Sequence, residues 1–169
     1  MTPEALFPAA EEDLNDAVEW VYNNGDRFKI NSNAIAVSGC SAGGQLAALI
    51  GTKNSNNRIK AVINIDGIST FINKETIERA QKARDTGAKM PVDAQWLNGT
   101  YSENPKHWTE ASALSWINDS SAPICFINSS IARFHNGRDE HIELLQNISI
   151  YSEEHTFEDS PHTFWLFHP

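Results

Sequence analysis

Residues 34–51 read AIAVSGCSAGGQLAALIG, and this stretch decides the fold. It begins with an apolar run, Ala34 to Ser38, of the kind that forms a buried strand. Gly39-Cys40-Ser41-Ala42-Gly43 follows and matches the pattern G-x-S-x-G. Apolar residues then recur at helical spacing until Gly51, which we expect to end the helix. A strand, this motif and a helix in succession predict a nucleophile elbow, a sharp turn that presents its central serine.

Ser41 is the residue that such a turn exposes. A serine hydroxyl is a weak nucleophile until a neighbouring base takes its proton. Gly39 and Gly43 are expected where the turn brings strand and helix too close for a side chain. The helix begins at the serine, so its free N–H groups face the place where an oxyanion would form. The sequence therefore predicts Ser41 as the nucleophile.

Charge and composition narrow the classes of function. The 169 residues carry 13 basic and 22 acidic side chains, a net charge of −9, without a Lys/Arg cluster. This balance argues against nucleic acid or an anionic membrane as a partner. The sequence has no apolar run long enough for a membrane-spanning helix, and its acidic first residues do not resemble a signal peptide, so no compartment is indicated. The length predicts one domain, residues 1–169.

Strands and helices alternate along the rest of the chain. We expect strands at 61–66, 123–128 and 150–157, and helices at 8–24, 74–85 and 139–148, the first of them ended by Gly25. This alternation predicts an α/β domain with a mostly parallel sheet flanked by helices. Right-handed crossovers would place the loops that carry Ser41, Asp139 and His162 at the carboxyl ends of the strands. Cys40 and Cys125 lie in or beside strand-like runs and are expected to be free and buried.

Residues 69–121 interrupt the alternation with an excursion rich in tryptophan, glycine, asparagine and proline. Large aromatic side chains on loops often line binding sites, so we expect this segment to form a cap over a cleft. Trp96 and Trp108 within it, and Trp165 near the C-terminus, are candidate substrate contacts. The alternative is that these side chains anchor the segment onto the core.

His162 is the candidate base. It follows the last predicted strand and lies between Pro161 and an aromatic run, in a loop that can return to the elbow. In an elbow-type site the residues follow one another in the order serine, acid, histidine. The five other histidines lie in the excursion, within or beside predicted elements, or at the end of the chain: His107, His135, His141, His155 and His168.

Asp139 is the candidate acid that would orient this base. It comes just after the third predicted strand, where a carboxylate can accept the imidazole N–H and fix the tautomer. It could instead serve only as a helix cap. Glu140 and Asp159 could also supply the acid, and so could Asp66, which lies one strand earlier.

A zinc site is the competing interpretation of this part of the chain. His135, Asp139 and His141 are close enough in sequence to ligate zinc. Their spacing is not a zinc signature, however, and a metal would leave the elbow unexplained. We therefore predict no metal and no cofactor.

The chain resembles the C-terminal part of an α/β-hydrolase fold esterase, close to the bacterial group of acetylxylan, pectin acetyl and feruloyl esterases. The resemblance covers nearly all residues and rests on five stretches: FPAAEEDLNDAVEWV, AVSGCSAGGQLAALIGT, LNGTYSENPKHWTEASALSWI, SSIARFHNGRDEHI and HTFEDSPHTFWLFHP. It implies a serine esterase acting on acyl esters of plant polysaccharide. By this resemblance Ser41 is the nucleophile, His162 the base, Asp139 the acid and the Ala42 N–H an oxyanion donor.

The sequence departs from the full fold upstream of the elbow. The first strands and the Gly-rich loop that supplies a second oxyanion donor do not occur, so we expect an N-terminally truncated domain. Losing one such donor typically costs about 100- to 1,000-fold in rate. An unpaired elbow strand invites pairing with another chain, which predicts a homo-oligomer. Two other functions remain open: a catalytically impaired module that serves in assembly or binding, and a serine peptidase of the same fold.

Overall fold

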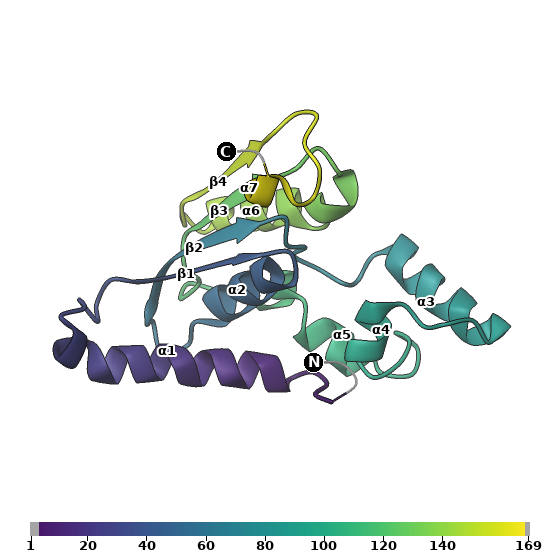
Figure 1. The fold of residues 1–169 in the computed structure, drawn as a ribbon, viewed down its shortest axis with the longest axis horizontal. Helices are drawn as coiled ribbons and strands as arrows, with labels where there is room; N and C mark the ends of the chain where they lie inside the picture. The colour runs from purple at the N-terminus through teal and green to yellow at the C-terminus, as the bar shows by residue number, and fades with distance from the viewer. Residues whose placement is uncertain (1–3, 168–169) are drawn as a thin grey trace.

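A computed structural model describes residues 4–167 of the chain. Its strands are β1 (Ile35–Cys40), β2 (Ile59–Ile65), β3 (Ile124–Asn128) and β4 (Ser152–Thr156). Its α-helices are α1 (Ala9–Phe28), α2 (Ala42–Lys53), α3 (Lys74–Thr86), α4 (Val92–Trp96), α5 (Pro105–Glu110), α6 (Arg138–Asn147) and α7 (Phe164–Phe167), and two 3-10 helices are η1 (Ala113–Trp116) and η2 (Ala132–His135). In these residues the strands form one sheet of order β1-β2-β3-β4 (Figure 1).

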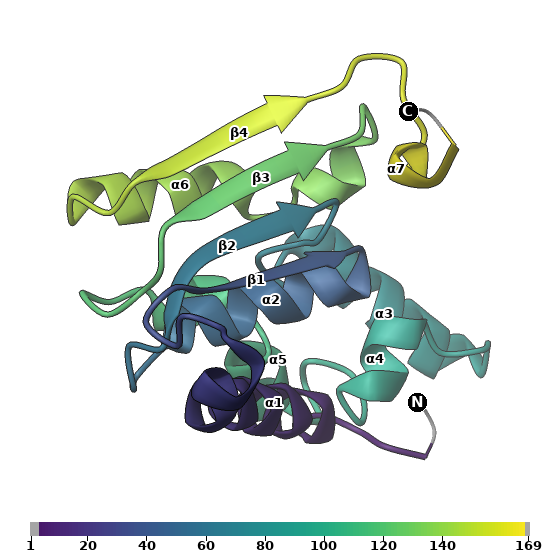
Figure 2. The ribbon, with the colours of Figure 1, turned by 60° about the vertical axis from the view of Figure 1, so that its left-hand side comes forward.

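Each neighbouring pair of strands is parallel, which confirms the predicted α/β class. The carboxyl ends of the strands therefore meet at one edge, and α7 lies beyond that edge (Figure 2). Helices α1, α2 and α6 lie on one face of the sheet. Between this face and the helices, Leu49, Val62, Phe126 and Leu145 form the centre of the buried core. No helix in residues 4–167 is long and apolar enough to cross a membrane.

Glycines that were expected to end helices lie inside them. Helix α1 continues past Gly25 to Phe28. A Cβ at Gly25 would collide with Ser32, whose hydroxyl donates to Tyr22 O. Helix α2 likewise continues through Gly51 and ends at Lys53, with Asn54 as its C-cap. A Cβ at Gly51 would collide with the Val62 side chain on β2. Both glycines permit close packing and are not caps.

A matched pair of glycines in α2 gives a stability prediction. We expect Gly51→Ala to lower the free energy of unfolding by about 1–3 kcal/mol, since the new methyl group is forced against Val62. Gly43→Ala places its methyl group in open space and is expected to be neutral or stabilising by up to about 1 kcal/mol. Urea denaturation of the two variants measures both effects. Equal stabilities would contradict this packing.

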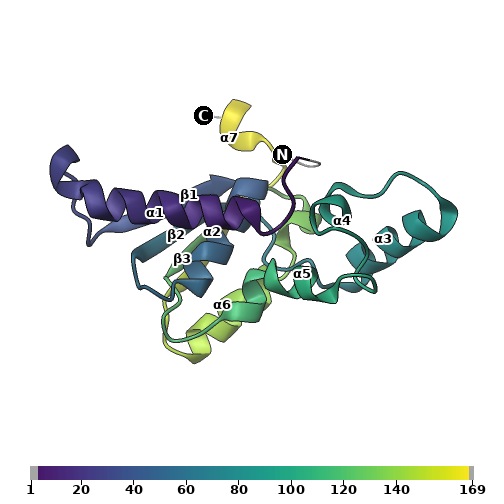
Figure 3. The same cartoon turned by 90° about the horizontal axis from the view of Figure 1, so that it is seen from below.

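Residues 69–121 form helices α3, α4 and α5, which gather at one end of the molecule (Figure 3), and η1, which packs against α2. The helix predicted at 74–85 is confirmed as α3, whose N-cap Asn73 accepts a hydrogen bond from the backbone of Thr76. The segment is tied to the rest of the chain by Gln45, which donates to Ala111 O over 2.8 Å. On its other side the backbone of Phe7 donates to Trp96 O.

Candidate active site

Ser41 lies in a sharp turn between β1 and α2, as the elbow predicts. Its backbone has φ 55° and ψ −119°, a strained conformation for a residue with a side chain. The Ser41 N–H donates to Ile65 O over 2.7 Å, which ties the turn to the neighbouring strand. Ala42 is the first residue of α2, so its N–H has no acceptor within the helix and lies beside the serine.

The glycines that permit this turn are not the expected pair. A Cβ at Gly39 would collide with the backbone of Gly43, and one at Gly44 would collide with the Asn64 side chain. Gly43 itself has nothing near the position of a Cβ. The close approach therefore requires Gly39 and Gly44. The prediction that a side chain at Gly43 would be too close to the strand is wrong.

The structure brings His162 to Ser41, although they are far apart in the sequence. The distance from His162 Nε2 to Ser41 Oγ is 2.9 Å. The imidazole stacks on the Phe134 ring, with 3.6 Å between centroids and 9° between planes. The Trp165 ring is nearly perpendicular to the imidazole, with 5.4 Å between centroids. These two aromatic rings limit the rotation of the imidazole and leave Nε2 directed at the serine.

The carboxylate that meets this imidazole is Asp66, at the carboxyl end of β2. Its Oδ2 lies 3.0 Å from His162 Nδ1, while Oδ1 accepts the Ser129 N–H at 2.7 Å and an N–H of Asn128 at 3.3 Å. Asp66 is 1% exposed and has φ 53°. The two donors hold the carboxylate in place, and Nδ1 of the histidine donates to it. That tautomer leaves Nε2 free to accept the serine proton.

The structure does not bring Asp139 to His162, so the predicted acid is corrected to Asp66. Asp139 lies in the first turn of α6, where its side chain is 80% exposed and accepts from Arg138 Nε at 2.7 Å. It faces solvent because β3 is followed by the η2 turn, and Phe134 of that turn occupies the space beside the imidazole. Glu140 and Asp159, the two remaining candidates for the acid, are exposed as well.

The remaining histidines have other surroundings. His135 Nε2 lies 2.7 Å from Ser129 O, and His107 Nδ1 lies near Leu97 O and the Asn104 amide. His141 is fully buried, with its ring nitrogens 3.3 Å from Thr52 Oγ1 and 3.1 Å from Ser69 Oγ. His168 lies outside the described residues. His135, Asp139 and His141 therefore each have protein partners of their own, which does not favour a zinc site at these three residues.

His141 gives the folded chain a pH dependence. Burial lowers the pKa of its imidazole from 6.5 to about 4, so the folded chain keeps it neutral. Below pH 6.5 the unfolded chain takes up a proton that the folded chain does not. The free energy of unfolding is therefore unaffected by His141 above pH 6.5. As the pH falls from 6.5 to 4, the uptake of this proton by the unfolded chain lowers the free energy of unfolding by about 3 kcal/mol in all.

The free energy of unfolding of the wild type is expected to fall between pH 7 and pH 5, and we expect this fall to be smaller by about 2 kcal/mol in His141→Gln. Urea denaturation at the two pH values measures it. His155→Gln, at an exposed position on β4, controls for the loss of an imidazole. A wild-type pH slope in His141→Gln would contradict the assignment.

A cavity of about 670 Å³ opens beside Ser41 and is lined mainly by apolar side chains. Trp96, Phe71 and Val92 of the 69–121 segment form part of its wall, together with Phe134. The prediction that Trp108 contacts the substrate is wrong. Its side chain is fully buried, and its indole N–H donates to Gly99 O at 3.1 Å. Trp165 contacts His162 and is not among the residues that line the cavity.

The two cysteines are free, as predicted, but half-buried. Burial and the nearby Asp66 carboxylate raise the pKa of the Cys40 thiol, which keeps it protonated beside Ser41. Burial and Glu153 raise the pKa of Cys125. Neither thiol has the lowered pKa of a cysteine nucleophile.

Three relatives share part of this sequence or fold. An AB hydrolase superfamily protein of Schizosaccharomyces pombe is 29% identical over 133 residues, covering 74% of this chain and 39% of that protein. Esterase LipC of Mycobacterium tuberculosis is 28% identical over 142 residues, covering 77% of this chain and 34% of its own length. The esterase of Pyrobaculum calidifontis has a TM-score of 0.77 at 23% identity, covering 99% of this chain and 56% of that one. At that identity the solved structure establishes the fold alone.

The chain thus spans well under half the length of these curated relatives. The relatives carry the α/β-hydrolase fold or an esterase name, in agreement with the parallel sheet and the elbow at Ser41. A family match covers residues 1–152, most of the chain. The chain belongs to the BD-FAE family of α/β-hydrolase esterases.

Proposed function

We propose that this chain carries the nucleophile and base of a serine carboxylic-ester hydrolase that removes acetyl or feruloyl groups from plant polysaccharide. One observation carries the proposal: Ser41, His162 and Asp66 form a continuous chain of contacts, with 2.9 Å between the first pair and 3.0 Å between the second. This is the geometry in which a neutral imidazole activates a serine hydroxyl.

In the proposed reaction Ser41 Oγ attacks the ester carbonyl while His162 Nε2 takes the hydroxyl proton. Asp66 stabilises the imidazolium that forms. The Ala42 N–H, at the start of α2, donates to the oxyanion of the tetrahedral intermediate. His162 then returns the proton to the leaving sugar oxygen. Water, activated by the same imidazole, attacks the acyl-serine and releases the acid.

The cavity supports an acyl group of moderate size. Its volume of about 670 Å³ lies within the range of small-molecule sites, and Trp96 and Phe71 offer aromatic surface for a planar acyl group. Residues 69–121 contribute these side chains, which supports their role as a cap. The carbohydrate part of the proposal draws on a fold neighbour named as a truncated form of carbohydrate esterase from gut microbiota, with a TM-score of 0.72 at 16% identity.

The test uses acetylated xylan, acetylated pectin and feruloylated arabinoxylan as substrates, with release of acetate or ferulate as the readout. We expect at least one acid to be released by the wild type and none by Ser41→Ala. Release of p-nitroaniline from an acylated peptide p-nitroanilide, without ester hydrolysis, would indicate a peptidase and would replace the proposal. If no substrate of either kind is cleaved, a catalytically impaired assembly or binding module replaces it.

We also propose that the chain self-associates through β1. Within residues 4–167, β1 pairs with β2 along one edge, and its second edge has no strand partner. Such an edge pairs readily with another strand. Light scattering on the purified chain should give twice the chain mass or more, and a monomeric mass would refute the proposal.

A further inference from the structure

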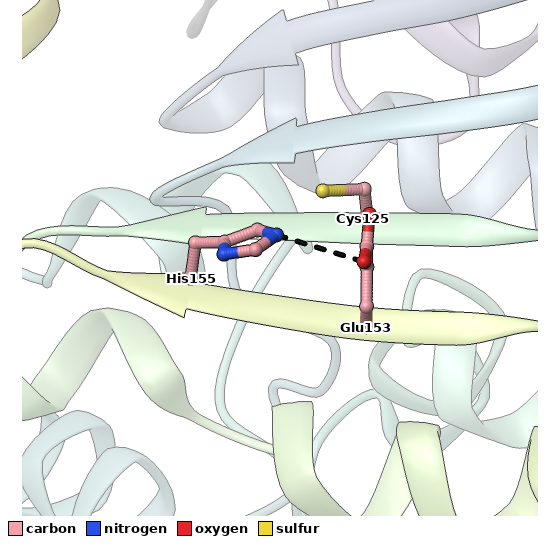
Figure 4. A group of neighbouring side chains, drawn as sticks. All are labelled: Cys125, Glu153 and His155. Atoms are coloured by element: carbon pink, nitrogen blue, oxygen red, sulfur yellow. Dashed lines mark ion pairs between the residues drawn. The ribbon is translucent and has the colours of Figure 1, made fainter.

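The face of the sheet opposite α1, α2 and α6 carries a second cluster of reactive side chains. No helix of residues 4–167 lies along this face, which is turned toward the viewer in Figure 2. Side chains alternate across a strand, and the alternation places Ile63 of β2 here, with 39% of its surface exposed. On the same face, at the β3–β4 pair, lie Cys125, Glu153 and His155 (Figure 4).

The sheet register fixes these three residues beside one another. Cys125 on β3 is the direct partner of Glu153 on β4. His155 follows Glu153 by two positions and therefore points to the same face. The distance from His155 Nε2 to Glu153 Oε2 is 3.6 Å, and one ligand atom from each residue lies within 4.8 Å of the other two. The backbone ladder, and not a flexible loop, brings the three groups together.

We propose that Cys125, Glu153 and His155 bind a zinc ion on this open sheet face. A thiolate sulfur, an imidazole nitrogen and a carboxylate oxygen are the three ligand types that zinc takes from proteins. Zinc bonds of about 2.0–2.3 Å in tetrahedral geometry place ligand atoms roughly 3.3–3.8 Å apart. Small side-chain rotations bring the three atoms to these separations. Three protein ligands leave the fourth position to water.

The neighbours of the cluster act on its carboxylate and on its thiol. Glu153 accepts the Tyr151 hydroxyl at 2.8 Å, and this bond lowers the pKa of the carboxyl, so the group is charged. Burial and the charge of Glu153 raise the pKa of the Cys125 thiol.

Binding would clamp β3 to β4. Strand β3 ends at Asn128 and is followed by Ser129, and both residues donate to Asp66. Strand β4 leads into the loop that carries His162. An ion bound to the folded chain also raises its thermal midpoint by mass action. Zinc should therefore stabilise the fold without touching Ser41.

The experiment titrates the metal-free chain with cobalt(II), a spectroscopic substitute for zinc, under a reductant that contains no thiol. A thiolate bound to cobalt gives a charge-transfer absorption in the near ultraviolet. We expect this band to saturate at one equivalent, to disappear when zinc is added, and to be absent in Cys125→Ser. His155→Gln, which changes an exposed residue, should weaken binding by more than about tenfold.

Cys40→Ser is the matched control, because it removes the other free thiol and leaves the cluster intact. It should keep the band. Circular dichroism and urea denaturation of the metal-free variants check that each is folded. A wild-type chain without a band, a band that persists in Cys125→Ser, or one that is lost in Cys40→Ser would overturn the proposal.

Discussion

Asp66→Asn is expected to reduce kcat for p-nitrophenyl acetate by about 10,000-fold, the loss seen when the orienting aspartate of a serine triad becomes an amide. The amide keeps the shape of the carboxylate but presents N–H groups toward the imidazole. His162 Nδ1 would then have to accept, which places the ring proton on Nε2 and directs it at Ser41. The serine would face a donor where it needs an acceptor.

Asp139→Asn is the matched control for this loss. Its side chain is 80% exposed and pairs with Arg138, so we expect kcat within about twofold of the wild type. Thermal unfolding of both variants shows whether a lost rate reflects lost structure. A large loss in Asp139→Asn together with a small one in Asp66→Asn would return the role of the acid to Asp139.

Trp108→Ala is expected to lower the free energy of unfolding by about 3–5 kcal/mol. The indole is fully buried, it makes a T-shaped contact with the Tyr101 ring at 6.0 Å between centroids, and its N–H donates to Gly99 O. Removing it leaves a cavity under the 69–121 segment and an unpaired carbonyl oxygen. Urea denaturation measures the loss.

Trp20→Ala controls for the removal of an indole as such. Trp20 is 52% exposed and packs against Phe28 alone among the described aromatic rings, so about 1 kcal/mol is expected. Comparable losses in the two variants would mean that Trp108 does not anchor the segment. The sequence alone does not decide whether Trp108 contacts the substrate or anchors the segment onto the core, because an aromatic residue on a loop can serve either purpose.

The elbow was predictable because a strand, a short glycine motif and a helix are all local features. Its partner acid was not, because the serine-acid-histidine order admits an acid after either β2 or β3. The signal for Asp66 was its place at the carboxyl end of β2, the strand beside β1, where parallel strands bring side chains to one edge. Its positive φ and its bond from Ser129 depend on tertiary contacts, which no local pattern shows.

The predicted ends of two helices were wrong for a similar reason. Gly25 and Gly51 have the local character of helix stops, but each is required by a side chain from elsewhere, Ser32 and Val62 respectively. Phe134 was missed as a neighbour of His162 because stacking across η2 and the C-terminal loop has no local pattern. The positions of β1, β2 and β3, in contrast, followed from apolar runs, and β3 was predicted within one residue.

The proposed chemistry depends on Ser41 being a nucleophile that His162 and Asp66 activate. The most direct measurement is the intact mass of the chain after reaction with diisopropyl fluorophosphate, followed by peptide mapping. We predict one label per chain, located on Ser41, absent in Ser41→Ala and formed far more slowly in His162→Gln. An unlabelled wild-type chain, or a label at another residue, would contradict this role.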